Sequence, residues 1–244
     1  MRLRAKPWRM TISVVAGATW LVVAAASLAG ATASNTLAYW QMNERSGAGT
    51  MVDSSGHHID GSIGNDVIVG ATYDGATGYR WAFTSPTNPP AKPERLVLVY
   101  DSRLNPGSGD FAVTLRYRTI QPFGNIIQKG QGGADGGYWK IENPRGILTC
   151  VFRGRDSNGN WQRKEVTSGT PLNDGQWHTV RCERTSSALT LTVDSRFTRT
   201  SSGRTGNISN PRPISIAGKS NCDQTHISCD YFTGDIDWVK IETG

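Results

Sequence analysis

The sequence predicts an all-β fold, a jelly-roll sandwich of two packed antiparallel sheets. Short runs of alternating apolar and polar residues recur throughout the chain after its N-terminal segment, and each is bounded by Gly, Asn, Asp or Pro. Helix signals are nearly absent from the same part of the chain. Parallel strands need crossover connections that are usually helical, so the strands are expected to pair antiparallel.

The clearest strand is expected at residues 111–118, where Phe111, Val113, Leu115 and Tyr117 share one face. Nine further segments have a similar strand character. They are residues 37–42, 96–100, 125–129, 138–142, 147–153, 178–184, 189–194, 214–217 and 232–241. Ten antiparallel strands fit two sheets of one sandwich, and about 210 residues lie within the size range of a single domain of this class.

The N-terminal segment has the three parts of a secretory signal peptide. Basic residues at positions 2, 4, 6 and 9 precede an uncharged, mostly apolar stretch from Met10 to Gly30, and small residues follow up to Ala33. We expect residues 1–33 to be removed by cleavage after Ala33, which leaves a secreted domain of residues 35–244. If the stretch stays uncleaved, it is long enough to anchor the chain in a membrane.

The charge of the chain argues against nucleic-acid binding. The formal net charge is +6, from 26 Lys and Arg against 20 Asp and Glu. Four of the basic residues and none of the acidic ones lie in the expected signal peptide, which leaves 22 against 20, or +2. The remaining basic residues are scattered singly along the strands instead of forming one basic face. No nucleic-acid partner is expected.

The four cysteines are expected to form two disulfides, because an exported protein meets an oxidising environment. Four cysteines allow three pairings. Cys222 and Cys229 are close in sequence and are expected to pair with each other, which leaves Cys150 with Cys182. Strand parity agrees, because it directs both Cys150 and Cys182 into the core beside apolar neighbours.

Three segments give the chain a resemblance to a known family. They are AYWQMNERSGAGTMVDSSG (38–56), LNDGQWHTVRCERTSSALTLTVDS (172–195) and FTGDIDWVKI (232–241). Their order and spacing resemble the laminin G-like domain of the concanavalin A-like lectin and glucanase superfamily, over residues 37–241. The resemblance implies a jelly roll of two curved sheets and a family whose members mostly bind glycans, proteins or Ca²⁺. It does not identify the ligand.

Enzymes also exist on this fold, so the strand at 232–241 is a candidate catalytic strand. Asp235 and Asp237 are expected on one face, as the paired carboxylates of a retaining glycosidase require. Glucanase relatives, however, carry two glutamates flanking an aspartate on such a strand, and the first glutamate here is Glu242. We therefore interpret the segment as an ordinary closing strand and expect no catalytic residue.

A calcium site is the more serious hypothesis. Asp237 shares strand parity with Val239 and Ile241, which predicts a carboxylate on the core side, where an unpaired charge is costly. Two solutions are open. Backbone N–H groups of the turn at Asp53 satisfy the carboxylate, or Asp237 and Asp53 hold a Ca²⁺ ion together with turn carbonyls. Laminin G-like relatives often bind Ca²⁺ with aspartates and carbonyls, so the resemblance supports Asp53 and Asp237 as metal ligands.

Two tryptophans are candidates for a glycan-binding surface. Aromatic faces stack on the C–H faces of sugars, although most tryptophans of a sandwich lie in its core. Trp40 and Trp177 match core positions of the family. Trp161, beside the polar hairpin tip at 156–160, and Trp139, after the glycine-rich segment 130–136, are expected to be exposed and to contact ligand.

The sequence therefore predicts a secreted, non-catalytic recognition module that binds a polysaccharide or glycoconjugate through Trp161 and Trp139. The alternative is an extracellular adhesion or structural domain that binds another protein. A glycan-cleaving enzyme is the third hypothesis.

Overall fold

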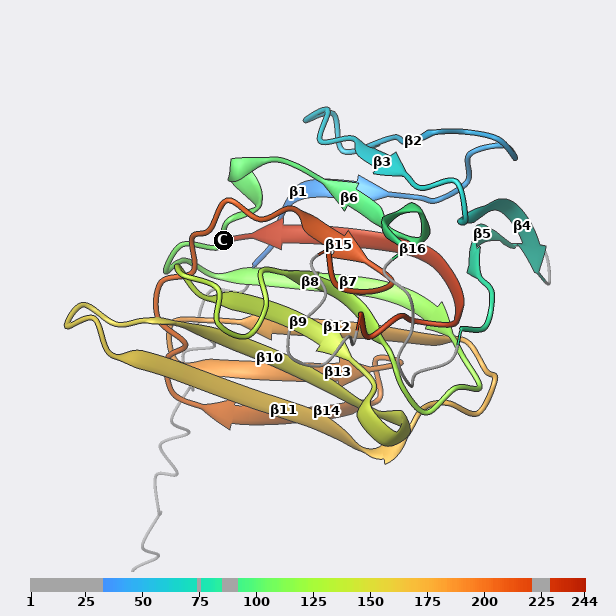
Figure 1. The fold of residues 1–244 in the computed structure, drawn as a ribbon. Coiled ribbons are helices and arrows are strands. Elements are labelled where there is room, and N and C mark those ends of the chain that lie inside the picture. The colour runs from blue at the N-terminus through green and yellow to red at the C-terminus, as the bar shows by residue number, and fades with distance from the viewer. Residues whose placement is uncertain (1–32, 74–75, 85–91, 221–228) are drawn as a thin grey trace, which may run out of the picture.

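The computed structural model describes residues 33–73, 76–84, 92–220 and 229–244, and these form two antiparallel sheets that pack face to face (Figure 1). Sheet A comprises β1 (Asn35–Trp40), β4 (Ile68–Tyr73), β5 (Ala76–Trp81), β7 (Phe111–Arg118), β12 (His178–Arg184), β13 (Ala188–Val193), β14 (Phe197–Ser202) and β16 (Gly234–Thr243). Sheet B comprises β2 (Thr50–Met51), β3 (Gly61–Ile63), β6 (Val97–Val99), β8 (Asn125–Lys129), β9 (Tyr138–Glu142), β10 (Ile147–Arg155), β11 (Trp161–Pro171) and β15 (Ile214–Ile216). The predicted fold class is confirmed.

The strand order follows the connections of a jelly roll. Sheet A runs β14-β13-β12-β7-β16-β5-β4, with β1 also paired to β16, and sheet B runs β11-β10-β9-β8-β15-β6-β3-β2. Short 3-10 turns at Pro93–Arg95, Ser102–Leu104 and Pro144–Gly146 interrupt the loops. Within the described ranges, no helix is long and apolar enough to cross a bilayer.

The core lies between β7, β12 and β16 on one side and β8, β9 and β10 on the other. The inward residues of β7 predicted from alternation are all fully buried. Phe111 meets sheet B directly, with ring centroids 5.7 Å from Trp139 and 6.3 Å from Phe152. Burial of each such side chain contributes about 1.5–3 kcal/mol, so this inter-sheet cluster is a main source of stability.

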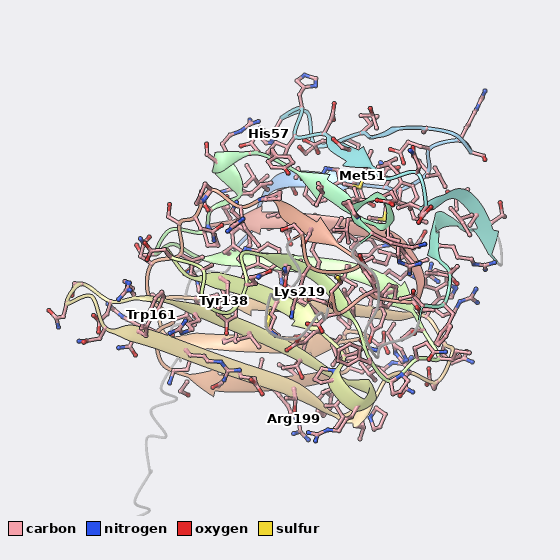
Figure 2. All side chains as sticks on the ribbon, viewed as in Figure 1. Met51, His57, Tyr138, Trp161, Arg199 and Lys219 are labelled. Carbon is pink, nitrogen blue, oxygen red and sulfur yellow. A yellow bond between two sulfur atoms is a disulfide. The ribbon has the colours of Figure 1, made fainter. Side chains whose placement is uncertain are left out.

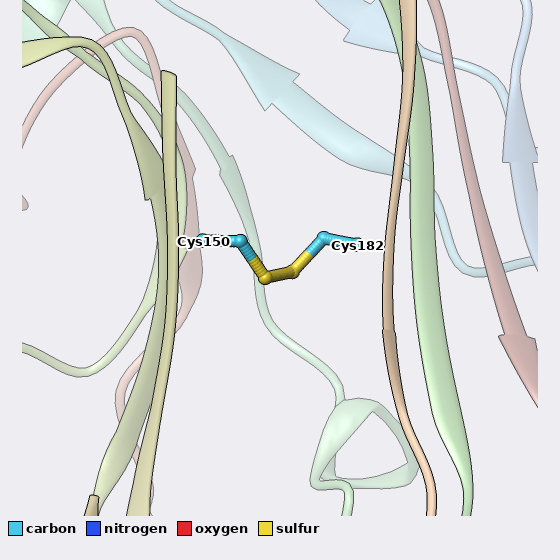
Figure 3. Close-up of a disulfide and its surroundings, with 2 residues drawn as sticks. All are labelled: Cys150 and Cys182. Carbon is cyan, nitrogen blue, oxygen red and sulfur yellow. A yellow bond between two sulfur atoms is a disulfide. The ribbon is translucent and has the colours of Figure 1, made fainter. Parts of the chain in front are cut away.

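A disulfide joins the two sheets across this core. Cys150 on β10 and Cys182 on β12 are bonded, with Cα atoms 6.0 Å apart (Figure 3). The predicted pairing is confirmed, and in the chain-entropy model a loop of this length contributes about 3–4 kcal/mol. The second predicted pairing, Cys222 with Cys229, stays a prediction because Cys222 lies outside the described residues.

A β-bulge in β16 changes the face on which Asp237 lies. Ile236 pairs with Tyr117 and Trp238 pairs with Arg116, so Asp237 is the extra residue between two registered pairs. Such a bulge shifts the alternation of the strand by one residue. Asp237 therefore does not share the face of the buried residues that follow it, and the expectation of a core-facing carboxylate is wrong. Its carboxylate accepts a hydrogen bond from Arg116 at 2.5 Å.

The loops of the sandwich gather at its two ends. In an antiparallel sheet, one strand ends at the same end of the sandwich at which its neighbour begins. For this reason one end carries the loops 100–110, 130–137, 156–160, 185–187 and 203–213. The β10–β11 hairpin extends furthest at this end, on the left of Figure 1. Both polar cavities described below open among these loops.

Candidate functional site

A polar cavity of about 510 Å³ lies at this loop end, where β10 and β12 finish. We call it the arginine pocket. It is lined by Ser108, Arg155, Asp156, Ser157, Arg184, Thr185, Ser186, Arg204, Thr205, Gly206 and Asn207. Three arginines from three separate segments thus converge with hydroxyl and amide side chains, a set of groups that suits an anionic, hydrogen-bonding ligand.

The floor of the pocket is the segment 204–208, which is held against the end of β10. Arg155 and Asn207 exchange backbone hydrogen bonds of 3.0 and 2.7 Å, and Gly107 and Ile208 exchange bonds of 2.9 and 2.8 Å. Gly206 has φ of 71°, and a Cβ there would lie 2.6 Å from the Arg155 backbone. Only glycine allows this close approach, and the approach brings Arg204 and Asn207 to the pocket.

Arg184 forms the buried wall of the pocket. It is 1% exposed, and its guanidinium donates to the backbone oxygens of Pro106, Gly107, Gly109 and Gly206. Burial lowers the pKa of Arg184 to about 10, which leaves it charged at neutral pH. It forms no ion pair within the described part of the chain, although the Asp110 carboxylate attracts its charge and offsets part of the effect of burial.

Trp161, on the hairpin at the left of Figure 2, contacts the guanidinium of Arg155 and that of one further arginine, Arg153. Arg155 pairs directly with Trp161 across β10 and β11. The Cζ atoms of Arg153 and Arg155 lie 3.8 and 3.9 Å from the centroid of the Trp161 ring. Cation–π contacts of this kind contribute about 0.5–1 kcal/mol at exposed sites. The indole is partly exposed, as predicted, and it fixes the positions of two cations.

The two exposed arginines of the site have no acidic partner within the described residues. Neither Arg155 nor Arg204 forms an ion pair among the residues that the structure describes. Asp156 is the one acidic residue that lines the pocket. Its carboxylate accepts from the backbone N–H groups of Asn160 and Asn158, and these hydrogen bonds lower its pKa. The pocket therefore combines three cations with one carboxylate that is engaged in its own turn.

Two buried polar atoms beside the pocket have no hydrogen-bond partner. They are Nε of Arg184 and Oγ1 of Thr205, and both residues line the cavity. Buried polar groups nearly always have partners, since an unsatisfied one costs about 1–3 kcal/mol.

Trp139 does not belong to this site, and the prediction that it is exposed is wrong. The residue is 0% exposed and stacks on Phe152, with ring centroids 6.2 Å apart. The reason is the register of β9, which places Trp139 opposite Phe152 on the core-facing side of β10. Lys140, one residue later, points outward instead.

A second arginine-rich region covers the outer face of sheet A, and we call it the paired face. Asp235, 6% exposed, accepts from Arg80 at 3.0 Å and from Arg118 at 2.9 Å. Asp237 accepts from Arg116 at 2.5 Å. On the same face, Arg181 pairs with Glu183 at 3.0 Å and also with Glu242. The candidate catalytic carboxylates of β16 are thus both members of ion pairs.

Trp177 lies on the paired face and not in the core. Its ring is partly exposed, and the Cζ atoms of Arg116 and Arg118 lie 4.5 and 4.9 Å from its centroid. The expected core position is therefore wrong for Trp177. It is correct for Trp40, which is fully buried and donates from Nε1 to the Ile59 carbonyl at 2.7 Å.

The Asp53 carboxylate is satisfied within its own turn. It accepts hydrogen bonds from the backbone N–H groups of Tyr39, Ser55 and Ile59 at 2.8, 2.9 and 3.0 Å. Burial opposes ionisation of Asp53, but these bonds together outweigh it and hold the pKa below its ordinary value. The carboxylate closes the turn that follows β1.

Calcium binding by Asp53 and Asp237 stays a prediction, and the contacts of the two carboxylates bear on it. Asp53 is engaged by backbone donors and Asp237 by Arg116, whereas Ca²⁺ requires six to eight oxygen ligands directed at one point. Within the described ranges, no group of three or more His, Cys, Asp or Glu residues is arranged to hold a metal. The alternative to calcium, in which backbone N–H groups of the Asp53 turn satisfy Asp237, is wrong, because Asp237 accepts from Arg116 and the backbone donors bind Asp53 itself.

Comparison with known proteins adds to this picture. A family model described as Laminin G domain matches residues 118–243, more than half of the chain. The binding domain of botulinum neurotoxin serotype G is similar in structure, with a TM-score of 0.57 and 13% identity over 86% of this chain and 47% of that chain. The binding domain of botulinum neurotoxin DC in complex with SialylT has a TM-score of 0.54 and 12% identity over 86% and 46%. The two neurotoxin domains support the fold.

A mammalian structure is also similar. Domains LG4-5 of the mouse laminin alpha1 chain have a TM-score of 0.47 and 20% identity, over 60% of this chain and 40% of that chain. The chain spans less than half the length of each of these three structures. Comparison with curated protein sequences gave no match.

Proposed function

Because the chain belongs to the laminin G domain family, we propose that it is a secreted, non-catalytic recognition module whose arginine pocket binds an acidic glycan. The observation that carries this proposal is the set of three arginines without ion pairs that line one polar cavity. A cavity that already contained balancing carboxylates would not need an anionic ligand.

The chemistry of the pocket indicates a carboxylate-bearing sugar. The planar guanidinium of arginine matches a carboxylate with two parallel hydrogen bonds, and Arg155 and Arg204 have exposed side chains for this contact. Ser108, Thr205 and Asn207 offer donors and acceptors for sugar hydroxyls. The buried charge of Arg184 adds to the positive potential of the site. Trp161 acts by positioning Arg153 and Arg155.

The relatives are consistent with glycan recognition. A similar neurotoxin binding domain was solved in complex with SialylT, and cell entry of botulinum neurotoxin type C depends on interaction with two ganglioside molecules. These statements concern the neurotoxins. They support a search among acidic glycans for this chain and do not identify its ligand.

The proposal excludes a hydrolytic role for β16. Asp235 and Asp237 are separated by a bulge and ion-paired with arginines, so they do not present two free carboxylates to a sugar. Release of reducing sugar from a panel of polysaccharides, abolished by Asp235→Asn, would contradict the non-catalytic part of the proposal.

Export is the other part of the proposal, and two contacts of Ala33 bear on where the mature chain would begin. The Ala33 backbone N–H donates to Glu183 at 3.1 Å, and its carbonyl accepts from Arg181 at 2.7 Å. Cleavage after Ala33 would remove both contacts. We propose that cleavage after Ala31, in the same small-residue motif, retains them. The intact mass of the exported protein distinguishes the two sites.

The glycan proposal is tested on an array of neutral and acidic glycans. Wild type should bind carboxylate-bearing glycans, and Trp161→Ala should bind them about tenfold more weakly, because two guanidiniums lose their support. The matched control is Trp238→Ala, which removes a partly exposed tryptophan that packs on Tyr39 with ring centroids 6.1 Å apart. Binding restricted to neutral glycans, or equal loss in both variants, would contradict the proposal.

A further inference from the structure

A second polar cavity, of about 470 Å³, opens at the same end of the sandwich. We call it the lysine pocket. It is lined by Tyr100, Asp101, Ser102, Asn105, Lys129, Ser209, Asn210, Pro211 and Arg212. Like the arginine pocket, it combines cationic side chains with hydroxyl and amide groups.

Lys129 is the unusual residue of this cavity. It is 1% exposed and lies at the end of β8, opposite Ile214, whose side chain faces the core. Its ammonium group donates to the Arg212 carbonyl at 2.6 Å, which is its one hydrogen bond in the described part of the chain. An ammonium group has three donors. A buried lysine with one acceptor and no ion pair is costly for the fold, and a ligand oxygen in the cavity would satisfy it.

The remaining lining suits a sugar. Tyr100 is 69% exposed and offers an aromatic surface at the rim. Arg212 is exposed and forms no ion pair within the described residues. Asp101 lines the cavity too and attracts Lys129 without forming an ion pair with it, because its carboxylate is bound by Arg103 at 2.6 Å. The lysine pocket therefore presents two cations that form no ion pair within the described residues, and its one carboxylate is already paired with Arg103.

One continuous segment connects the two cavities. Residues 204–207 line the arginine pocket and residues 209–212 line the lysine pocket. Ile208 between them is fully buried and bridged to Gly107, while Asn207 and Ser209 on either side are exposed. An extended chain advances about 3.3 Å per residue, so the two cavities are separated by at most roughly 20 Å along one surface.

We propose that the lysine pocket is a second subsite of the same glycan site, so that the ligand is an internal stretch of an acidic polymer and not a chain end. The polymer crosses the exposed segment at Asn207 and Ser209 and places carboxylates in both cavities. This inference rests on the proposed function, because it takes the arginine pocket as the first subsite of the glycan site and adds the lysine pocket as the second.

The test compares oligogalacturonides of increasing length with polygalacturonate, by titration calorimetry in a buffer that contains chelator. Short oligomers occupy one pocket, whereas longer ones occupy both. The longer oligomers bind more tightly because the second pocket is filled within the same complex, with no new type of contact. We expect a gain on the order of a hundredfold from dimer to polymer for wild type. Tyr100→Ala and Lys129→Met should each reduce that gain about tenfold.

The variants also separate the two proposals. Neither should change the affinity for the dimer, because the arginine pocket is intact in both. Tyr100→Ala changes an exposed residue, so it tests the second subsite independently of any change in stability that Lys129→Met causes. If the affinity of both variants increases from dimer to polymer as much as that of wild type, the second subsite is contradicted and the proposed function is not affected. No binding of any oligomer or polymer would contradict both, and dextran serves as the uncharged control polymer.

Discussion

The arginine pocket and the paired face use the same residue type in opposite ways. On the paired face, Arg80, Arg116 and Arg118 each lie against an aspartate. In the arginine pocket, Arg155 and Arg204 have no acidic partner in the described structure. Formal charge alone does not separate the regions, because both are rich in arginine. Pairing does, and on this ground we propose that the paired face stabilises the fold and that the arginine pocket binds ligand.

This comparison makes opposite predictions for stability. A cation without a counter-charge destabilises a fold when it is buried, so its removal should raise stability. A cation or anion within a partly buried ion pair leaves its partner unsatisfied when it is removed, so its loss should lower stability.

The largest effect is expected for Lys129→Met. Burial lowers the pKa of Lys129 to about 8, below its unfolded value near about 10.4. The charged form is therefore disfavoured in the folded state. This penalty is fully present below pH 8 and disappears as pH rises to about 10. Lys129→Met should raise the free energy of unfolding by roughly 3 kcal/mol at pH 7 and by little near pH 10.

Chemical denaturation of wild type and Lys129→Met across this pH range measures the difference. Lys140→Met is the matched control, because Lys140 is paired with Glu142 at 2.6 Å on the outer face of sheet B. A difference between wild type and Lys129→Met that does not change with pH would show that the charge of Lys129 is not the cause.

A smaller effect of opposite sign is expected on the paired face. Asp235→Asn leaves Arg80 and Arg118 without their shared carboxylate, and we expect a loss of about 2 kcal/mol. The loss is below that of a fully buried pair because both arginines are partly solvated. Asp237→Asn, with the single partner Arg116, should lose about 1 kcal/mol. Equal stability of Asp235→Asn and wild type would contradict the claim that the ion pairs of the paired face stabilise the fold.

The smallest effect is expected from metal removal. Since Asp53 is satisfied by backbone donors and Asp237 by Arg116, stripping with chelator should leave the melting temperature unchanged. A calcium site would add about 2.7 kcal/mol at a hundredfold excess of Ca²⁺ over Kd. A melting temperature that rises with millimolar Ca²⁺ and no longer rises in Asp237→Asn would overturn our assignment of both carboxylates.

Most strands with a buried face could be predicted from sequence, but β4 and β5 were missed although Tyr79 and Trp81 of β5 are buried. All ten predicted strands are present, and residues 111–118, 125–129, 138–142 and 178–184 match their observed bounds. An alternation of apolar and polar residues indicates a strand that has one buried face. β14 is almost entirely exposed and β11 is an edge strand rich in polar residues, so neither shows the pattern. β2 and β3 are too short to show any period.

The site was harder to predict than the fold. Trp161 could be found because turn residues mark the neighbouring hairpin tip. Arg155, Arg184 and Arg204 could not be grouped, since only long-range contacts bring their three segments together. Trp139 was predictable as a core residue, because it alternates with Ile141, but the glycine-rich segment before it suggested exposure.

Asp237 shows a different limit. Its face depends on a bulge that no residue type in β16 indicates, and a shift of one residue reverses every inward and outward assignment along a strand. Pairing across the strands, and not parity within one strand, decides where such a side chain lies.

The most direct test of our account compares Arg204→Ala with Arg80→Ala. Each variant removes one arginine and one positive charge, from the arginine pocket and from the paired face respectively. Affinity for polygalacturonate is measured by titration calorimetry at constant ionic strength. We predict that Arg204→Ala weakens binding at least tenfold and that Arg80→Ala binds as wild type does. Equal weakening in both variants would mean that binding follows net charge alone, and it would contradict the assignment of binding to the unpaired arginines.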